Sequence, residues 1–375
     1  MIEFERFRPH KRFLLVLIIL VLVVGGTIAL LSGPSEGIPG SAKTQIHDSL
    51  AADITQFQQM TPKRGISLPD DFRFHVGYRQ EWWHFFADVV DQEGQRYSVK
   101  WHYYRVAMNS RNASGWENPQ LYIATTVITS GQRVWRAQRL ARGGIGQAGF
   151  RERPFRLWLD NWSWRSLGLM PFPGLLNVNG DGFAVQLNST AAGPYVLDGK
   201  QGYQEKRNAP SVGSYQFRAP FLNVAGDLIL DGVPVSVRGT ATLSKEWGNR
   251  ILNQGPEHQD QFFLRFHNGM TLLINRFSYP LQSTTYFGTL AQRDGSTVHL
   301  DGSDIHIFPE SYTELIEGHQ FPARWIIVIP KYNIRLTVVP RESGQWHPFL
   351  IPLWEGGITA SGTHNATGYM YFSGY

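Results

Sequence analysis

The sequence predicts an all-β body built from two barrels or sandwiches, and two observations carry this prediction. The chain combines 38 glycines, 23 phenylalanines, 15 tyrosines and 12 tryptophans with only 17% charged residues. Aromatic rings fit the pleated surface of a sheet, and glycine fits its tight turns. From Ser67 onward, apolar runs of strand length alternate with turn residues, without a long helical period. Turns spaced by roughly 8–12 residues are typical of barrels and sandwiches.

The first half of the body contains eight runs rich in aromatic and β-branched residues, which we expect to be strands. They are 81–90, 96–108, 121–128, 155–164, 183–188, 213–219, 223–230 and 233–242. Asp231-Gly232 lies between the last two, and an Asp-Gly pair between apolar runs predicts a tight hairpin turn.

The second half repeats this pattern. Its expected strands are 261–267, 270–279, 284–293, 297–308, 325–329, 334–340, 354–361 and 367–375. Asn268-Gly269 separates the first two and predicts a second tight hairpin. The body is too long for one small barrel, so we expect two domains, 67–222 and 223–375.

The amino-terminal residues predict a membrane segment. Phe13 to Leu31 carries no charge and follows the basic residues of the first twelve positions. A helix of that length rises ~28 Å, close to the thickness of a bilayer core. We therefore expect residues 1–33 to be a single-pass anchor in the inner (cytoplasmic) membrane, followed by a linker at 34–66, with the body facing the periplasm. Secretion after signal cleavage stays open, although Ala29-Leu30-Leu31-Ser32-Gly33 is a mediocre cleavage site.

Several functional classes are excluded or disfavoured by what the sequence lacks. The chain has no cysteine, which excludes disulfides, a cysteine nucleophile, thiolate metal ligands and a lipoprotein cysteine. The formal net charge of +5 lies partly before residue 13, so no basic stripe for nucleic acid is expected. The body from Ser67 onward holds no Gly-x-Ser-x-Gly motif of a serine hydrolase, and the glycines at 143–146 do not form a nucleotide-binding motif. We expect no cofactor.

Six segments, in chain order, resemble those of the AttH / carotenoid 1,2-hydratase (CrtC) lipocalin-like superfamily. They are Tyr78 to Phe85, Arg139 to Gly146, Leu157 to Trp162, Gly239 to Gly248, Trp354 to Gly356, and Gly368 to Tyr375. The resemblance covers about residues 67 to 375 and is nearest to members described as "predicted secreted hydrolase". It implies two tandem lipocalin-like β-barrels after the transmembrane helix, a ligand cavity in or between them, and an ABC-type permease as partner.

The chain departs from the hydratases of this superfamily at two places. Where those enzymes carry an Asp-His-Asn-Trp-Gly-like string, this sequence reads Ser244-Lys245-Glu246-Trp247-Gly248. Where they carry a Tyr-x-Asp pair on the following strand, Met270 to Arg276 holds no carboxylate. The resemblance therefore does not carry hydratase activity over to this chain.

Glu246 and Glu81 are the candidate catalytic residues, because each lies beside tryptophan in a strand-like run. Burial against indole rings would raise the pKa of a carboxyl group, as a general acid requires. The alternative is a structural ion pair with an arginine, which would lower that pKa. The arginines considered as partners are Arg79, Arg105, Arg265 and Arg276.

Seven residues are expected to contact a ligand: Trp82, Trp83, His84, Trp101, His102, Trp247 and Arg276. The tryptophans are suited either to line an apolar cavity or to close the barrels by packing. His84 and His102 lie in aromatic strands, and no His-x-His or His-Glu-x-x-His pattern offers a third ligand nearby. The sequence therefore predicts ring packing for the histidines and no metal site.

Taken together, the sequence predicts an extracytoplasmic protein that binds a hydrophobic or lipid-like small molecule, and the family resemblance implies a role as an accessory to an ABC-type permease. The alternative is an enzyme of hydratase/isomerase or pericyclase type that acts on an apolar, isoprenoid-like substrate. A pericyclase needs mainly shape and hydrogen bonds, so the missing hydratase residues do not exclude it.

Overall fold

The computed structural model describes residues 55–62, 64–206, 213–249, 258–278, 283–313 and 318–374, and these residues form an all-β protein. Their only helical segments are single 3₁₀ turns: η1 (Asp70–Phe72), η2 (Gly115–Glu117), η4 (Gly302–Asp304) and η5 (Pro330–Tyr332). No helix in this part of the chain is long and apolar enough to cross a membrane. The predicted anchor at 13–31 and most of the predicted linker lie outside the described residues.

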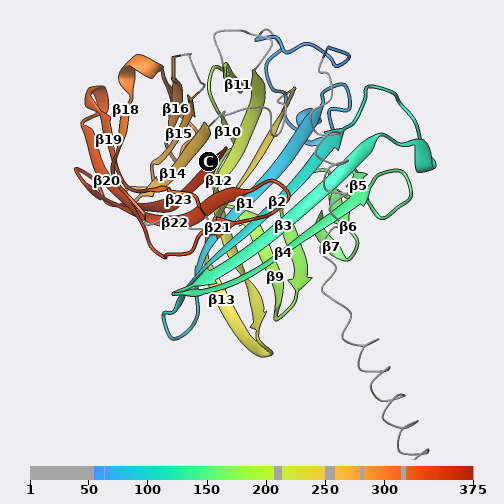
Figure 1. Ribbon diagram of the computed structural model, residues 1–375, viewed down its shortest axis with the longest axis horizontal. Coiled ribbons are helices and arrows are strands. Elements are labelled where there is room, and N and C mark those ends of the chain that lie inside the picture. Colours follow the sequence, from blue (N-terminus) through green and yellow to red (C-terminus); the bar gives the residue numbers. More distant parts are fainter. Residues whose placement is uncertain are drawn as a thin grey trace, which may run out of the picture. The chain divides into compact units, whose positions relative to one another are not determined.

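Thirteen antiparallel strands form the larger sheet, a nearly closed barrel (Figure 1). Eleven of them follow one path in the order β4-β3-β2-β1-β13-β12-β9-β8-β7-β6-β5, and β10 and β11 pair with β12. Their bounds are β1 (Gln80–Val90), β2 (Arg96–Ala107), β3 (Gln120–Ser130), β4 (Arg133–Arg142), β5 (Ala148–Arg151), β6 (Arg156–Leu159), β7 (Trp162–Ser166), β8 (Gly174–Gly180), β9 (Phe183–Ala191), β10 (Val196–Leu197), β11 (Tyr203–Gln204), β12 (Ser214–Leu230) and β13 (Val233–Gly248).

The smaller sheet has ten antiparallel strands and forms a half-barrel (Figure 1). Its order is β17-β16-β15-β14-β23-β22-β20-β19-β18, with β21 paired to β22, so the last strand of the chain lies in the middle of the sheet. The bounds are β14 (His258–Phe266), β15 (Thr271–Ser278), β16 (Thr285–Ala291), β17 (Thr297–Leu300), β18 (His306–Tyr312), β19 (Pro322–Ile329), β20 (Ile334–Pro340), β21 (Trp346–His347), β22 (Leu353–Gly362) and β23 (Ala366–Ser373).

Side-chain alternation along the strands produces three buried layers. Trp83 and Phe85 belong to the core inside the larger barrel, whereas Phe262 and Leu264 belong to the core of the smaller sheet. A third layer lies between the two sheets, where the Phe86 and Tyr369 rings meet at 4.9 Å. We call this third layer the intersheet layer. Because successive residues of a strand point to opposite faces, one strand such as β1 supplies two layers at once.

The all-β class and the two barrel-like sheets are confirmed. The predicted boundary between residues 222 and 223, however, falls inside β12, and the larger sheet continues to Gly248. The reason is that β12 runs on through a register shift between Ala219 and Leu222 and pairs with β13 along nearly its whole length. The second sheet begins only at His258.

Three further differences concern single strands. The run 155–164 is two strands, β6 and β7, separated by a turn in which Asp160 has a φ of 53°. The run 297–308 is likewise divided by η4 into β17 and β18. Strands β4, β5 and β8 were not expected, because arginines and glycines interrupt their apolar pattern.

Candidate functional site

Strand β1 divides the sequence-predicted residues between two layers. Glu81 and Trp83 point into the larger barrel, where Trp83 is part of the core. Trp82 and His84 point the other way, into the intersheet layer, and their rings stack at 5.8 Å with an interplanar angle of 3°. The four consecutive residues at 81–84 therefore serve two separate groups of side chains.

In the intersheet layer, five side chains form a compact aromatic and ionic group, which we call the intersheet cluster: Trp82, His84, His102, Tyr104 and Glu355. On adjacent strands, Trp82 lies directly opposite Tyr104 and His84 lies directly opposite His102. The two imidazole rings are 4.4 Å apart, and all five residues are buried. Cross-strand register thus stacks the rings in pairs on one face of β1 and β2.

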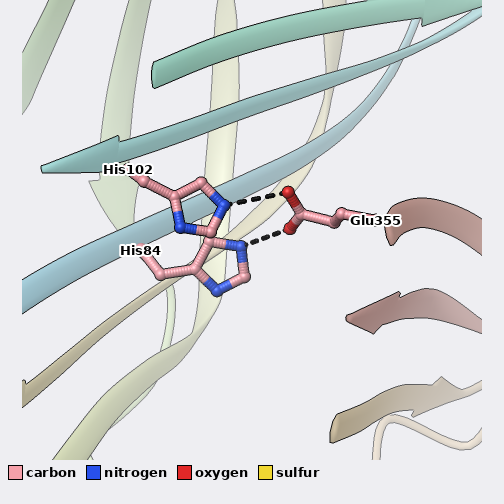
Figure 2. A group of neighbouring side chains, drawn as sticks. All are labelled: His84, His102 and Glu355. Atoms are coloured by element: carbon pink, nitrogen blue, oxygen red, sulfur yellow. Dashed lines mark hydrogen bonds and ion pairs between the residues drawn. The ribbon is translucent and has the colours of Figure 1, made fainter. Parts of the chain in front are cut away.

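Glu355 reaches this group from β22 of the opposite sheet, as Figure 2 shows. Its Oε1 lies 2.7 Å from His84 Nε2 and its Oε2 lies 2.9 Å from His102 Nε2. Burial alone would raise the pKa of Glu355, but the charge and hydrogen bonds of His102 and His84 hold that pKa well below its usual value. Burial lowers the pKa of His84. The cluster therefore favours an ionised Glu355 carboxylate, whereas burial disfavours the charged form of His84.

A second group of polar residues surrounds the main chain of Glu355. Lys100 Nζ donates to Gln345 Oε1 at 2.7 Å and to the carbonyl oxygen of Glu355 at 2.9 Å. Burial lowers the pKa of Lys100 to about 8 and that of His347 to about 3. Lys100 therefore joins the two sheets by main-chain and amide contacts rather than by the Glu355 carboxylate.

The intersheet layer continues past Tyr369 to a buried ion pair. Arg218 Nη2 donates to Asp198 Oδ1 at 2.8 Å, and the guanidinium lies 5.0 Å from the centre of the Phe263 ring. Burial raises the pKa of Asp198 to about 6. Tyr369 contacts both ends of this layer, because its ring meets His84 edge-on at 4.8 Å and Phe263 at 5.5 Å.

Glu246, a predicted catalytic residue, also lies on the intersheet face. In the register of β1 and β13 it is directly opposite Trp82. Its carboxylate is buried and forms an ion pair with the buried Lys206. The ion pair is of the kind considered as the structural alternative, with a lysine in place of an arginine, and the catalytic role of Glu246 stays a prediction.

Glu81 occupies a different environment inside the barrel. Its carboxylate lies 2.6 Å from Lys245 Nζ, 3.5 Å from His75 Nδ1 and 3.7 Å from Arg105 Nη2. Burial would raise the pKa of Glu81, but Lys245, His75 and Arg105 outweigh that effect and lower the pKa to about 2. The raised pKa considered for a general acid is therefore not found at Glu81, and the ion-pair alternative describes this residue.

Lys245 links Glu81 to the 71–73 turn. Besides Glu81, its Nζ donates to the carbonyl oxygens of Asp71 and Phe72 at 2.8 and 3.1 Å, and also to that of Arg73. An ammonium group has three protons, so the Glu81 carboxylate and the three carbonyl oxygens, four acceptors in all, share them. The side chain that stands where the hydratases carry histidine thus fixes the 71–73 turn against the barrel.

The remaining predicted ligand contacts are not brought to the cluster. Trp83, Trp101 and Trp247 pack in the core of the larger barrel, where Trp247 stacks on His75 at 4.0 Å. Arg276 lies in the smaller sheet, 2.5 Å from Asp260 Oδ2. Only Trp82, His84 and His102 of the predicted contacts meet in the intersheet layer.

Sequence reasoning missed Glu355, Tyr104, Lys100 and Arg218. Glu355 stands in the stretch Leu353-Trp354-Glu355-Gly356-Gly357-Ile358, where the sequence itself indicates only one of the six family segments. A single carboxylate in an otherwise apolar strand is costly to bury without a partner. This cost indicates that Glu355 has a buried partner, but the sequence does not indicate which residue that partner is.

A nearly closed barrel and a half-barrel that meet across a buried layer of rings and ionisable groups define a lipocalin-like β protein. The chain belongs to the AttH-like family, whose model matches residues 59–375. A crystal structure of a Nitrosomonas europaea protein named for AttH is similar, with a TM-score of 0.77 and 21% sequence identity over 85% of this chain and 99% of that one. Kievitone hydratase from Nectria haematococca is similar with a TM-score of 0.63 and 15% identity, over 86% of this chain and 96% of that one. A comparison with curated protein sequences finds no match.

Proposed function

We propose that this protein binds a small, largely apolar organic molecule, with a few polar groups, in the intersheet layer. The aromatic wall of Trp82, Tyr104 and Tyr369 supplies apolar surface for such a molecule. Arg218 and the histidines beside that wall supply groups that orient it. Small-molecule sites in proteins are typically lined by mostly apolar side chains with a few placed polar groups.

One observation carries the proposal. Several buried polar atoms of the intersheet layer have no hydrogen-bond partner within the described part of the chain, namely Arg218 Nε and Nη1, Asn275 Nδ2 and Thr242 Oγ1. Folded proteins pair most of their buried polar atoms, and each exception calls for an explanation. A ligand with carbonyl, carboxylate or hydroxyl oxygens would accept from the arginine and amide protons.

The proposal is tested by native mass spectrometry of the full chain purified gently from its own membranes, followed by extraction and identification of small molecules. We expect a co-purifying apolar species, which Trp82→Leu depletes and Trp158→Leu does not. Trp158 is the matched control, because it is half-buried and its indole Nε1 donates to the carbonyl oxygen of Gly146, away from the intersheet layer. The proposal is wrong if both variants retain the co-purifying molecule equally, or if no small molecule co-purifies with the unmodified protein.

A second candidate is an enzyme of hydratase/isomerase or pericyclase type. Its support is the placement of proton-transferring groups, His84, His102 and Glu355, directly against aromatic rings. A similar fold also serves in the kievitone hydratase, although likeness at 15% identity extends to the fold alone. The extracted molecule, returned to the protein in isotopically labelled water, distinguishes the readings. Hydration adds one labelled water, isomerisation rearranges bonds without mass change, and pure binding leaves the molecule as it was.

We further propose that residues 13–31 anchor the chain in the inner membrane, with the body in the periplasm and an ABC-type permease beside it. The uncharged stretch after basic residues supports the anchor and its orientation, and family resemblance alone supports the permease. Alkaline extraction of membranes tests the anchor, since a cleaved and secreted chain would leave the pellet. Crosslinking in intact cells tests the permease.

A further inference from the structure

We propose that His84, His102 and Glu355 form a binding site for one divalent transition-metal ion of the Zn²⁺ class. The three residues come from β1, β2 and β22, and their ligand atoms all lie within 4.8 Å of one another. Two imidazole nitrogens and one carboxylate are a common ligand set for Zn²⁺ and Fe²⁺ in proteins, with further positions left for water or a substrate. The site shares its histidines with the ligand-binding proposal above, and the metal titration below tests it separately from the co-purification of an apolar molecule.

The directions of the donor atoms favour a shared ion. Both imidazoles present the same nitrogen, Nε2, to one carboxylate, as Figure 2 shows. In the structure these nitrogens are 2.7 and 2.9 Å from the two carboxylate oxygens. Bonds of ~2.1 Å at tetrahedral angles separate ligand atoms by about 3.4 Å, so an ion requires the donors to spread by roughly half an ångström.

Residues behind the donors orient one of the rings as metal sites require. The Tyr104 hydroxyl lies 3.1 Å from His102 Nδ1, the nitrogen that faces away from Glu355. When Nε2 holds a metal, Nδ1 carries the proton and donates it to the tyrosine oxygen. The Trp82 ring stacks on both imidazoles, at 5.8 Å from each, and holds their planes nearly parallel. Lys100 binds the main-chain oxygen of Glu355 and leaves the carboxylate to the histidines.

His75 shows how a different geometry excludes chelation. This buried histidine also contacts two carboxylates, but through different nitrogens: Nε2 lies 2.9 Å from Asp71 Oδ1, and Nδ1 lies 3.5 Å from Glu81 Oε1. The two nitrogens of one ring point apart, so they cannot bind the same ion. His75 is therefore a matched control for a buried histidine in an ionic network without a metal.

The test uses the full chain in detergent, stripped with a chelator and then titrated with Zn²⁺ or Co²⁺. We expect one ion per chain by elemental mass spectrometry, and Co²⁺ ligand-field bands of a nitrogen and oxygen ligand set. Glu355→Gln and His102→Asn should lose binding at least 100-fold, and Tyr104→Phe should weaken it about tenfold. His75→Asn should bind as the unmodified chain does.

Failure of the unmodified chain to bind one ion overturns the site, as does equal binding by a folded Glu355→Gln variant. Equal losses in His75→Asn and His102→Asn would also overturn it, because they would indicate adventitious binding. If Glu355→Gln does not fold, two measurements still distinguish a metal site from a structural contact: the Co²⁺ spectrum of the unmodified chain and the metal affinity of Tyr104→Phe. If the three residues only hold the two sheets together, neither the Co²⁺ ligand-field bands nor the weaker metal binding of Tyr104→Phe is expected.

Discussion

Replacing Glu81 by glutamine is expected to lower the free energy of unfolding by about 3 kcal/mol at neutral pH. The side chain is fully buried, and its pKa lies at about 2 instead of the ordinary 4.5. Each pKa unit of this shift corresponds to about 1.4 kcal/mol. The lowered pKa of Glu81 therefore contributes about 3 kcal/mol to the free energy of unfolding at neutral pH. The substitution also leaves Lys245 and Arg105 without their common buried counter-charge.

The same shift sets the pH dependence of the effect. The folded protein holds Glu81 ionised at a lower pH than the unfolded chain does, so the unfolded chain binds more protons between these pKa values. The contribution of Glu81 is therefore present in full above pH 4.5 and is lost as the pH falls toward about 2. The difference in stability between the unmodified chain and Glu81→Gln should shrink over this window.

The assay is equilibrium unfolding followed by tryptophan fluorescence, at neutral pH and at several acidic pH values. The double variant Glu81→Gln, Lys245→Met is the control, because removal of both charges should recover a large part of the loss. A change below about 1 kcal/mol at neutral pH, or a difference that does not shrink toward acid, would refute the ion-pair account of Glu81.

Two further predictions concern the backbone and the junction of the sheets. Gly368→Ala should destabilise the protein by about 3 kcal/mol, because a Cβ there would lie 1.8 Å from the carbonyl oxygen of Phe263. Thermal unfolding of Gly168→Ala, where the nearest such atom is 4.0 Å away, is the comparison, and equal melting temperatures would contradict the steric argument. Arg341→Met should cost about 1–3 kcal/mol, since Arg341 donates to Asp88 and Ser98 of the opposite sheet at 2.7 and 2.8 Å. Limited proteolysis should then cut the smaller sheet faster, and an unchanged cleavage rate would show that this contact does not hold the sheets together.

The strands were largely predictable because their cause is local. Alternating apolar residues and Asp-Gly or Asn-Gly turns act within a few positions, as in the hairpin of β12 and β13, where Asp231 and Gly232 have φ of 50° and 82°. The end of the larger sheet was harder to predict. It depends on how far β12 continues past an irregularity, and the pairing partner decides that rather than the local sequence.

Only the part of the candidate site that the larger sheet contributes was predictable from the sequence. His84 and His102 are close in sequence and lie opposite each other, so an aromatic hairpin already indicated them. Glu355 is 271 positions from His84 and 253 from His102, and it belongs to the other sheet. No short-range pattern joins residues across such a distance, and the placement of one sheet on the other alone brings them together.

The central position of β23 sets a condition on how the second sheet forms during synthesis. Among the described residues, the half with β14 to β17 and the half with β18 to β22 share no strand pairing except through β23, Ala366–Ser373, which follows all the other strands of this sheet in the sequence. Pairings that span such long stretches of chain form slowly, since the intervening loop must be closed first. The smaller sheet is therefore completed only after β23 has been synthesised. Removal of β23 would leave the two halves of the sheet without a strand that pairs with both.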